Sequence, residues 1–117
     1  TERGIIAIYR GNFQAAETYH TESLTAFREE GNRAGEASAL SNLSRVLGSL
    51  GRPDAAVEAA RKALSIYRGL GSELRLANGH YALGMALGKR GSHREALREL
   101  SLALVFSRTI GSRCGWG

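Results

Sequence analysis

The sequence predicts an all-α protein, a right-handed α-solenoid built from antiparallel helical hairpins. Two features of composition and spacing indicate it. The chain has one proline against seventeen alanines and fifteen leucines, which favours helices over turn-rich β structure. Glycines recur at every twentieth position, namely Gly11, Gly31, Gly51, Gly71, Gly91 and Gly111. A period of this length is typical of repeat architectures, in which each unit buries its apolar face against the next.

The glycines set the expected helix boundaries. Glycine accepts the left-handed conformation that ends many helices, so the spacing predicts helices of about 17 residues, near 25 Å long, joined by short turns. Asn12 and Ser92 are expected N-caps, and Ser92 with Glu95 has the spacing of a capping box. Pro53 is expected at the first position of its helix.

Alternate glycines are equivalent, so the structural repeat is forty residues long. Residues 31–70 align with 71–110 without a gap, and 1–30 align with the last three quarters of either. Small residues recur in phase at Ser44 and Gly84, at Ala16, Ala56 and Ala96, and at Ser23, Ala63 and Ala103. We therefore predict one domain over 1–112, with a partial repeat (1–30), two full repeats (31–70 and 71–110) and a tail (113–117).

Charge is unevenly distributed along the chain. Residues 1–40 contain four basic and six acidic side chains, a balance of −2, and residues 41–117 contain twelve and five, a balance of +7. The net charge of +5 permits contact with nucleic acid or with an acidic protein. Cys114 is the single cysteine, which excludes an intrachain disulfide and favours a reducing, cytoplasmic location. No apolar run reaches the roughly 18 residues of a membrane span, and the start at Thr1 suggests a segment excised from a longer chain.

The sequence contains no recognisable catalytic or metal-binding constellation. His20, His80 and His93 fall on three different expected helices, and no ligand pair has the spacing of a zinc site. Gly84 to Lys89 lacks the spacing of a phosphate-binding loop, so Gly84 and Gly88 are interpreted as close-packing positions. We expect a non-enzymatic protein without a cofactor or a metal ion.

Residues 37–64 resemble the tetratricopeptide repeat. The matching positions are Ala37, Leu40, Asn42, Leu43, Ser44, Leu47, Gly51, Ala56, Val57, Ala63 and Leu64. That family has a small residue at its eighth position, glycine at the fifteenth, alanine at the twentieth and Ala-Leu at the twenty-seventh and twenty-eighth. All four features recur forty residues later, at Gly84, Gly91, Ala96 and Ala103-Leu104. The resemblance covers nearly all of residues 1–110.

The repeat departs from the family's usual form in its length. The usual period is 34, and the six extra residues fall around 67–76, where the usual proline is also absent. Long repeats of this kind, with Arg-x-x-Gly before the turn, resemble those of kinesin light chains, cell-polarity adaptors and bacterial regulators of transcription. Arginine far in excess of lysine, with abundant alanine and glycine, suggests a GC-rich bacterial genome and favours the last group.

The resemblance implies a binding surface on the concave side, which the first helix of each hairpin lines in this family. By position it comprises Ser38, Ser41, Asn42, Arg45, Ser49, Asn78, Tyr81, Met85 and Lys89, with Ile5 and Tyr9 from the partial repeat. Asn42 suits a peptide backbone, Arg45 and Lys89 suit carboxylates, and Tyr81 and Met85 offer apolar contact. Of the five positions of the family's carboxylate clamp for acidic C-termini only Asn42 agrees, which argues against a chaperone-tail receptor.

These observations predict a protein-interaction scaffold, the sensor or assembly segment of a larger regulatory protein that binds a partner peptide or helix. A groove that binds nothing itself remains an alternative. A second is nucleic-acid binding by Arg90, Arg94 and Arg98, although interleaved Glu95 and Glu99 predict helix-surface ion pairs instead. A third is self-association through uncapped repeat ends near Ile5, Ile8, Leu97 and Leu104, where the opposite charge of the two ends favours head-to-tail contact.

Overall fold

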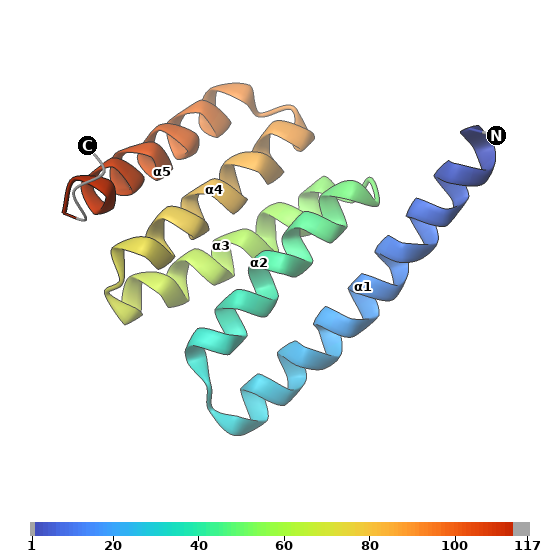
Figure 1. The fold of residues 1–117 in the computed structure, drawn as a ribbon, viewed down its shortest axis with the longest axis horizontal. Helices are drawn as coiled ribbons and strands as arrows, with labels where there is room; N and C mark the ends of the chain where they lie inside the picture. The colour runs from blue at the N-terminus through green and yellow to red at the C-terminus, as the bar shows by residue number, and fades with distance from the viewer. Residues whose placement is uncertain (1, 114–117) are drawn as a thin grey trace.

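The computed structural model describes the backbone of residues 2–113 and the side chains of residues 12–108. In that range the chain forms helices and no strands. The helices are α1 (Glu2–Glu30), α2 (Arg33–Ser49), α3 (Pro53–Leu70), α4 (Glu73–Arg90) and α5 (His93–Arg113). Consecutive helices run in opposite directions and stack side by side (Figure 1). The predicted α-solenoid of helical hairpins is confirmed.

Four of the six periodic glycines end a helix as predicted. Gly31, Gly51, Gly71 and Gly91 all have positive φ, between 71° and 94°. At three of these turns the residue after the glycine donates its backbone N–H to a carbonyl five positions back, as Ser92 does to Leu87 at 2.9 Å. The following helices begin at side-chain caps on Asn32 and Ser72 and at Pro53, the first residue of α3. Each turn is therefore closed by local hydrogen bonds.

The other two glycines lie inside helices, so the helix ends predicted at Gly11 and Gly111 and the N-cap predicted at Asn12 are wrong. Glycine permits a left-handed turn but does not impose one, and a hairpin is stable only where both of its arms pack. Figure 1 shows α1 continuing as one helix, with its N-terminal half extending away from α2. The partial repeat 1–30 therefore forms one helix and no turn.

Of two smaller predictions at the C-terminal hairpin, the capping box is wrong and the tail lies almost entirely outside the described residues. The capping box of Ser92 and Glu95 does not form, because the Ser92 N–H bonds to the Leu87 carbonyl and the Glu95 carboxylate lies 3.8 Å from Arg61. The predicted tail 113–117 overlaps the last residue of α5, and residues 114–117 lie outside the described residues.

The helices pack as a ladder. Each helix packs on its neighbours along the chain, and α2 also lies beside α4. This arrangement places α2 and α4, the first helices of the two hairpins, on one side of the stack. Their adjacent exposed surfaces are where the concave surface is expected.

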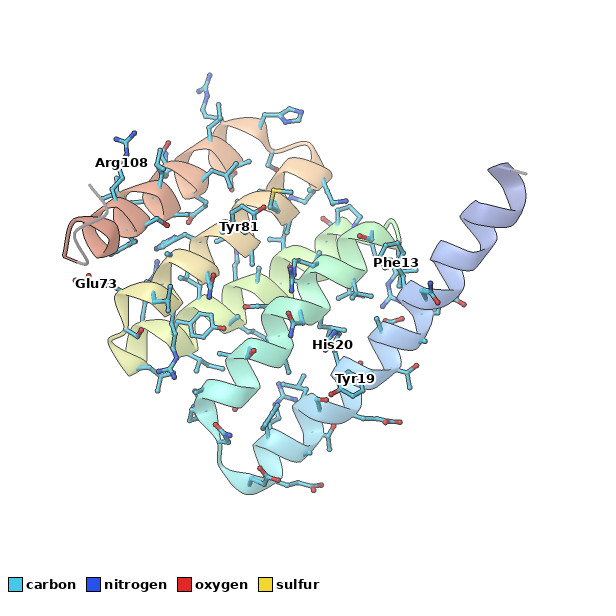
Figure 2. The ribbon with its side chains drawn as sticks, viewed as in Figure 1. Phe13, Tyr19, His20, Glu73, Tyr81 and Arg108 are labelled. Atoms are coloured by element: carbon cyan, nitrogen blue, oxygen red, sulfur yellow. The ribbon has the colours of Figure 1, made fainter. Side chains whose placement is uncertain are left out.

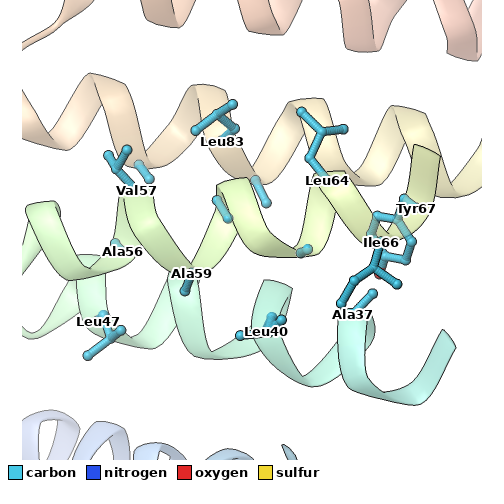
Figure 3. Packing of buried hydrophobic residues seen from close by; sticks show 14 of the residues in the cluster. Ala37, Leu40, Leu47, Ala56, Val57, Ala59, Leu64, Ile66, Tyr67 and Leu83 are labelled. Atoms are coloured by element: carbon cyan, nitrogen blue, oxygen red, sulfur yellow. The ribbon is translucent and has the colours of Figure 1, made fainter. Parts of the chain in front are cut away.

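Small residues bring the helices close together. Ala56, Ala60 and Ala63 on α3 are completely buried, and Figure 3 shows Val57 and Leu64 pointing from α3 toward α4. A Cβ on Gly79 would lie 2.8 Å from Leu64 Cδ1, and one on Gly84 would lie 2.7 Å from Leu100 Cγ. Gly84 is therefore a close-packing position, as predicted, whereas a Cβ on Gly88 would make only ordinary contact at 3.9 Å.

The family positions have specific packing roles. The Ser44 hydroxyl donates a 2.7 Å hydrogen bond to the Ala56 carbonyl, which joins α2 to α3 inside the core. Ala56 and Ala96 are both buried, in agreement with their predicted place at helix–helix contacts. Small side chains at these positions therefore allow each hairpin to close.

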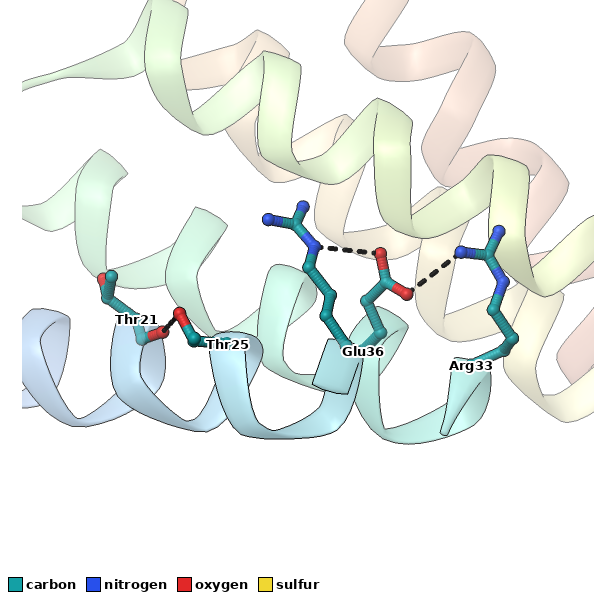
Figure 4. A network of polar contacts seen from close by, with 5 residues as sticks. Thr21, Thr25, Arg33 and Glu36 are labelled. Atoms are coloured by element: carbon teal, nitrogen blue, oxygen red, sulfur yellow. Dashed lines mark hydrogen bonds and ion pairs between the residues drawn. The ribbon is translucent and has the colours of Figure 1, made fainter. Parts of the chain in front are cut away.

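Two part-buried polar clusters tie neighbouring helices together. Figure 4 shows Glu36, at the start of α2, between Arg28 at 3.2 Å and Arg33 at 3.0 Å. His80 Nδ1 on α4 lies 2.5 Å from a Glu99 carboxylate oxygen on α5, and its ring stacks on Phe106. Among the described residues no helix is long and apolar enough to cross a membrane.

Candidate partner-binding groove

The predicted binding residues come together between α2 and α4. Two adjoining hollows of about 220 and 230 Å³ lie there. They are lined by eight of the predicted residues, namely Ser38, Ser41, Asn42, Arg45, Asn78, Tyr81, Met85 and Lys89. The polar hollow is lined by Ser38, Ser41, Asn42, Arg45, Asn78 and Tyr81, and the more apolar one by Arg45, Ser49, Tyr81, Met85 and Lys89. We call these two hollows the α2/α4 groove.

The α2/α4 groove contains two cations without a carboxylate partner. The Arg45 guanidinium donates a 2.6 Å hydrogen bond to the Asn42 side-chain oxygen and makes no ion pair among the described residues. Lys89 makes none either, and its aliphatic stem lies across Gly48, where an added Cβ would be 2.8 Å from Lys89 Cδ. Both charges are therefore available to an acidic ligand.

Arginine 45 also affects the neighbouring helix. His20 on α1 lies between α1 and α2 (Figure 2), and its pKa is lowered first by burial and then by the Arg45 charge. The neutral imidazole is favoured because a protonated ring would face this guanidinium. The positive potential of the groove thus extends to α1.

Apolar and neutral polar groups complete the groove. Tyr81 projects from the middle of α4 with half of its surface exposed, and Met85 follows one turn later. In the polar hollow that Tyr81 also lines, the Ser41 hydroxyl is buried and has no hydrogen-bond partner among the described residues. The site therefore combines one exposed aromatic ring, a flexible thioether and an unsatisfied hydroxyl.

Sequence reasoning missed part of the lining. Ser44, Gly48, Tyr67, Ala82 and Ala86 also border the two hollows. Gly48 could have been found from the repeat, because the equivalent position forty residues later is also glycine, Gly88. A glycine inside a helix leaves room for a side chain from a neighbouring helix to lie across it. Ile5 and Tyr9 were predicted for the same surface, and their side chains lie outside the described residues.

The arginines of the nucleic-acid alternative are arranged differently from the prediction. Glu95 pairs with Arg61 on α3 and Glu99 contacts His80 on α4, so the expected ion pairs along the surface of α5 do not form. Arg94 and Arg98 are exposed and make no ion pair among the described residues. Glu99 turns toward the buried His80, whereas the Arg61–Glu95 pair is exposed on both sides and contributes little stability.

Stacked helical hairpins with small residues at the helix contacts and a groove between first helices define a helical-repeat protein. The chain belongs to the tetratricopeptide repeat family, whose sequence patterns match residues 1–69, more than half of the chain, and residues 77–101. The family predicted from the sequence is thus confirmed. Tetratricopeptide repeats form a non-enzymatic repeat fold that generally mediates protein–protein interactions.

Two bacterial regulatory proteins are similar to the chain. The regulatory protein AfsR of Streptomyces coelicolor is 45% identical over 85 residues, which are 73% of this chain and 9% of that protein. The regulatory protein AfsR of Streptomyces griseus is 50% identical over 66 residues, 56% of this chain and 7% of that protein. The chain spans less than a tenth of the length of either relative.

Proposed function

We propose that this chain is a non-enzymatic, cytoplasmic protein-interaction module of a regulatory protein, and that its α2/α4 groove binds an acidic segment of a partner protein. Similarity to two regulatory proteins and membership of a protein-binding repeat family support the class of function. The chemistry of the groove supports the class of ligand.

This proposal rests on two cations that lie beside an exposed aromatic ring and form no ion pair within residues 12–108. Arg45 and Lys89 line the same hollow as Tyr81, with no carboxylate among its lining residues. An acidic side chain of the ligand pairs with each cation, and an apolar side chain packs on Tyr81 and Met85. Asn42 and Asn78 offer donors and acceptors to the ligand backbone.

A peptide library tests the proposal. Acidic peptides selected from a display library should bind with about micromolar affinity, as expected for a groove formed by only two first helices. Replacing both Arg45 and Lys89 with alanine should weaken binding by at least about tenfold in calorimetry, while the circular dichroism spectrum stays unchanged. The matched control replaces Arg94 and Arg98, two cations on the outer side of α5, and should change binding by less than about twofold. Equal losses in the two double variants would contradict the assignment.

Nucleic-acid binding remains the alternative. The observation in its favour is that Arg94 and Arg98 are exposed and form no ion pair with another described residue. Phosphate contacts release counterions, so duplex binding by these arginines would fall steeply with salt, whereas a peptide bound by two cations loses affinity gradually. A labelled 20-base-pair duplex titrated at 50 and 200 mM salt separates the two functions. Duplex affinity that depends on Arg94 and Arg98 would support the alternative.

A further inference from the structure

The two hollows of the α2/α4 groove follow one another along the helices. They share Arg45, Tyr81 and Ala82 as a common boundary. On α2, the residues that line the apolar hollow lie about five positions beyond those that line the polar hollow, and on α4 they lie about four positions beyond. At a rise of about 1.5 Å per residue, the hollows are therefore centred about 6–8 Å apart.

An extended ligand matches this spacing. Side chains at alternate positions of a β-strand point to the same side and lie about 6.6–6.8 Å apart. The backbone of an extended ligand also has unpaired N–H and C=O groups, whereas a helix bonds its own. Asn42 and Asn78 flank the polar hollow from α2 and α4, and the NH₂ group of each makes no hydrogen bond among the described residues. The groove therefore suits an extended segment.

The polar hollow suits a carboxylate. Arg45 has no carboxylate beside it there, and the 2.6 Å hydrogen bond that its guanidinium donates to the Asn42 side-chain oxygen fixes its direction. The Ser41 hydroxyl lines the same hollow and is buried without a hydrogen-bond partner among the described residues. A ligand carboxylate gives this hydroxyl an acceptor and gives the guanidinium a counter-ion.

The apolar hollow ends at Lys89, and Gly48 determines where that lysine lies. The Lys89 stem crosses α2 at Gly48, where an added Cβ would be 2.8 Å from Lys89 Cδ and 3.5 Å from Cε. A side chain at position 48 would therefore lift the stem away from α2. Lys89 lies about four positions beyond the middle of the α4 residues that line this hollow, which is about 6 Å along the helix. That distance is close to one further alternate side chain of an extended ligand.

Gly88, forty residues after Gly48, lacks this arrangement. An added Cβ on Gly88 would make only ordinary contact with the Ala96 methyl, at 3.9 Å, and Gly88 does not line the α2/α4 groove. Both glycines lie inside a helix, where alanine favours the helix by a similar amount. Only the substitution of Gly48 therefore displaces a cation of the groove.

We propose that the α2/α4 groove binds its ligand in an extended conformation and selects three alternate side chains, acidic, apolar and acidic, with Gly48 as the positioning residue for the last. The first carboxylate pairs with Arg45, the apolar side chain packs on Tyr81 and Met85, and the second carboxylate pairs with Lys89. The inference rests on the proposed function, to which it adds the order, the spacing and the conformation of the selected side chains.

Three peptides of identical composition test the spacing. Each contains two aspartates on either side of one leucine, separated from it by one, two or three serines, with the remaining serines at the ends. Because the order is the same in both directions, one peptide tests either direction of binding. In fluorescence anisotropy with the 117-residue chain, the peptide with single serines should bind at least about tenfold more tightly than the other two.

The outcomes separate this inference from the proposed function. Equal affinity of the three peptides would overturn the spacing and leave the proposed function standing. Preference for the peptide with three serines, whose spacing suits one side of a helix, would overturn the extended conformation. No binding by the three peptides, while acidic peptides from the display library still bind, would overturn this inference alone.

Alanine substitutions test the role of Gly48. Gly48→Ala should weaken binding of the single-serine peptide by at least about fivefold, and the matched Gly88→Ala control should change it by less than about twofold. In a chain that already carries Lys89→Ala, Gly48→Ala should have no further effect, because it acts only through the lysine. Thermal melts verify that all variants fold. Equal losses for the two glycine variants, or the same loss from Gly48→Ala with and without Lys89, would overturn the positioning role.

Discussion

The hairpins α2/α3 and α4/α5 have the same register of small and large residues but different surroundings. In α3, alanines and leucines at the contact positions are buried on two sides, beneath α2 and α4. In α5, Ala96 and Ala103 are buried against α4, while Leu97 and Leu104 remain exposed. The register therefore determines which side of a helix can be buried, and the next helix determines whether it is buried.

The largest expected change in the free energy of unfolding concerns Ala56, whose equivalent Ala96 is buried in the other hairpin. Ala56→Arg should lower the free energy of unfolding by about 3 kcal/mol or more, because a long charged side chain cannot fit between α2 and α3. Glu58→Arg, two residues away on the outer side, should change it by no more than about 0.5 kcal/mol. Urea denaturation of both variants measures the difference. Similar losses would show that the assigned register is wrong.

A pair of equivalent leucines tests the contrast directly. Leu64→Ala should cost about 2–4 kcal/mol of stability, since it removes buried methyl groups and leaves a cavity beneath Gly79. Leu104→Ala, forty residues later, should cost less than about 0.5 kcal/mol because its side chain is exposed. Chemical melts give both values. A large loss for the Leu104 variant would mean that another molecule covers Leu104 in solution.

A smaller change in stability is expected at the family position that is serine in one hairpin, Ser44, and glycine in the other, Gly84. Ser44→Ala should cost about 1–2 kcal/mol, because the buried Ala56 carbonyl loses its hydrogen bond from the serine hydroxyl. Gly84, the equivalent residue, has no hydroxyl, so α4 and α5 lack this hydrogen bond at the corresponding position. Ser65→Ala on the exposed side of α3 is the control and should leave the melting temperature within about a degree. The prediction is wrong if the two serine variants melt together.

The smallest expected effect is a pH dependence at the α1/α2 contact. His20 occupies the position equivalent to Ala60 and Leu100, and its pKa lies below the ordinary value of 6.5. The folded chain therefore binds its proton less readily than the unfolded chain. His20 has no effect on stability well above pH 6.5 and destabilises the fold as pH falls below it.

Two measurements check this sign. His20→Gln should retain more of its stability on acidification from neutral pH than the unmodified chain does. Arg45→Gln should raise the His20 pKa in an NMR titration, since the second cause of its depression is removed, whereas Arg68→Gln should leave it unchanged. A His20 pKa that falls in the Arg45 variant would contradict the electrostatic account.

Much of the fold could be predicted from periodicity because glycine turns and small contact positions are local properties of the sequence. Helices end as predicted at four of the glycines, because glycine adopts the left-handed conformation of the turn. These are Gly31, Gly51, Gly71 and Gly91. Gly11 and Gly111 do not, because a turn also requires two arms that pack, and that requirement is not local.

The location of the α2/α4 groove could be predicted for a similar reason. Positions such as Asn42, Arg45 and Tyr81 follow from the repeat register once the first helices are recognised. The partners of Glu95 and Glu99 could not be predicted, because these carboxylates contact Arg61 and His80 on other helices. Glu36 likewise contacts Arg28 of α1, in addition to Arg33 of its own helix. Sequence spacing along one helix does not contain those distances.

The ladder arrangement has a consequence for how the molecule opens. Each helix packs on its sequence neighbours, α2 also lies beside α4, and the Arg61–Glu95 ion pair links α3 to α5. No contact joins the first helix to the last among the described residues. We therefore expect local opening to start at the outer helices of this stack, and amide hydrogens of α3 to exchange more slowly than those of α5. A ligand that packs on one outer helix should slow amide exchange in that helix and in the helices next to it. Slower exchange several helices from the ligand would then report that the ligand is bound.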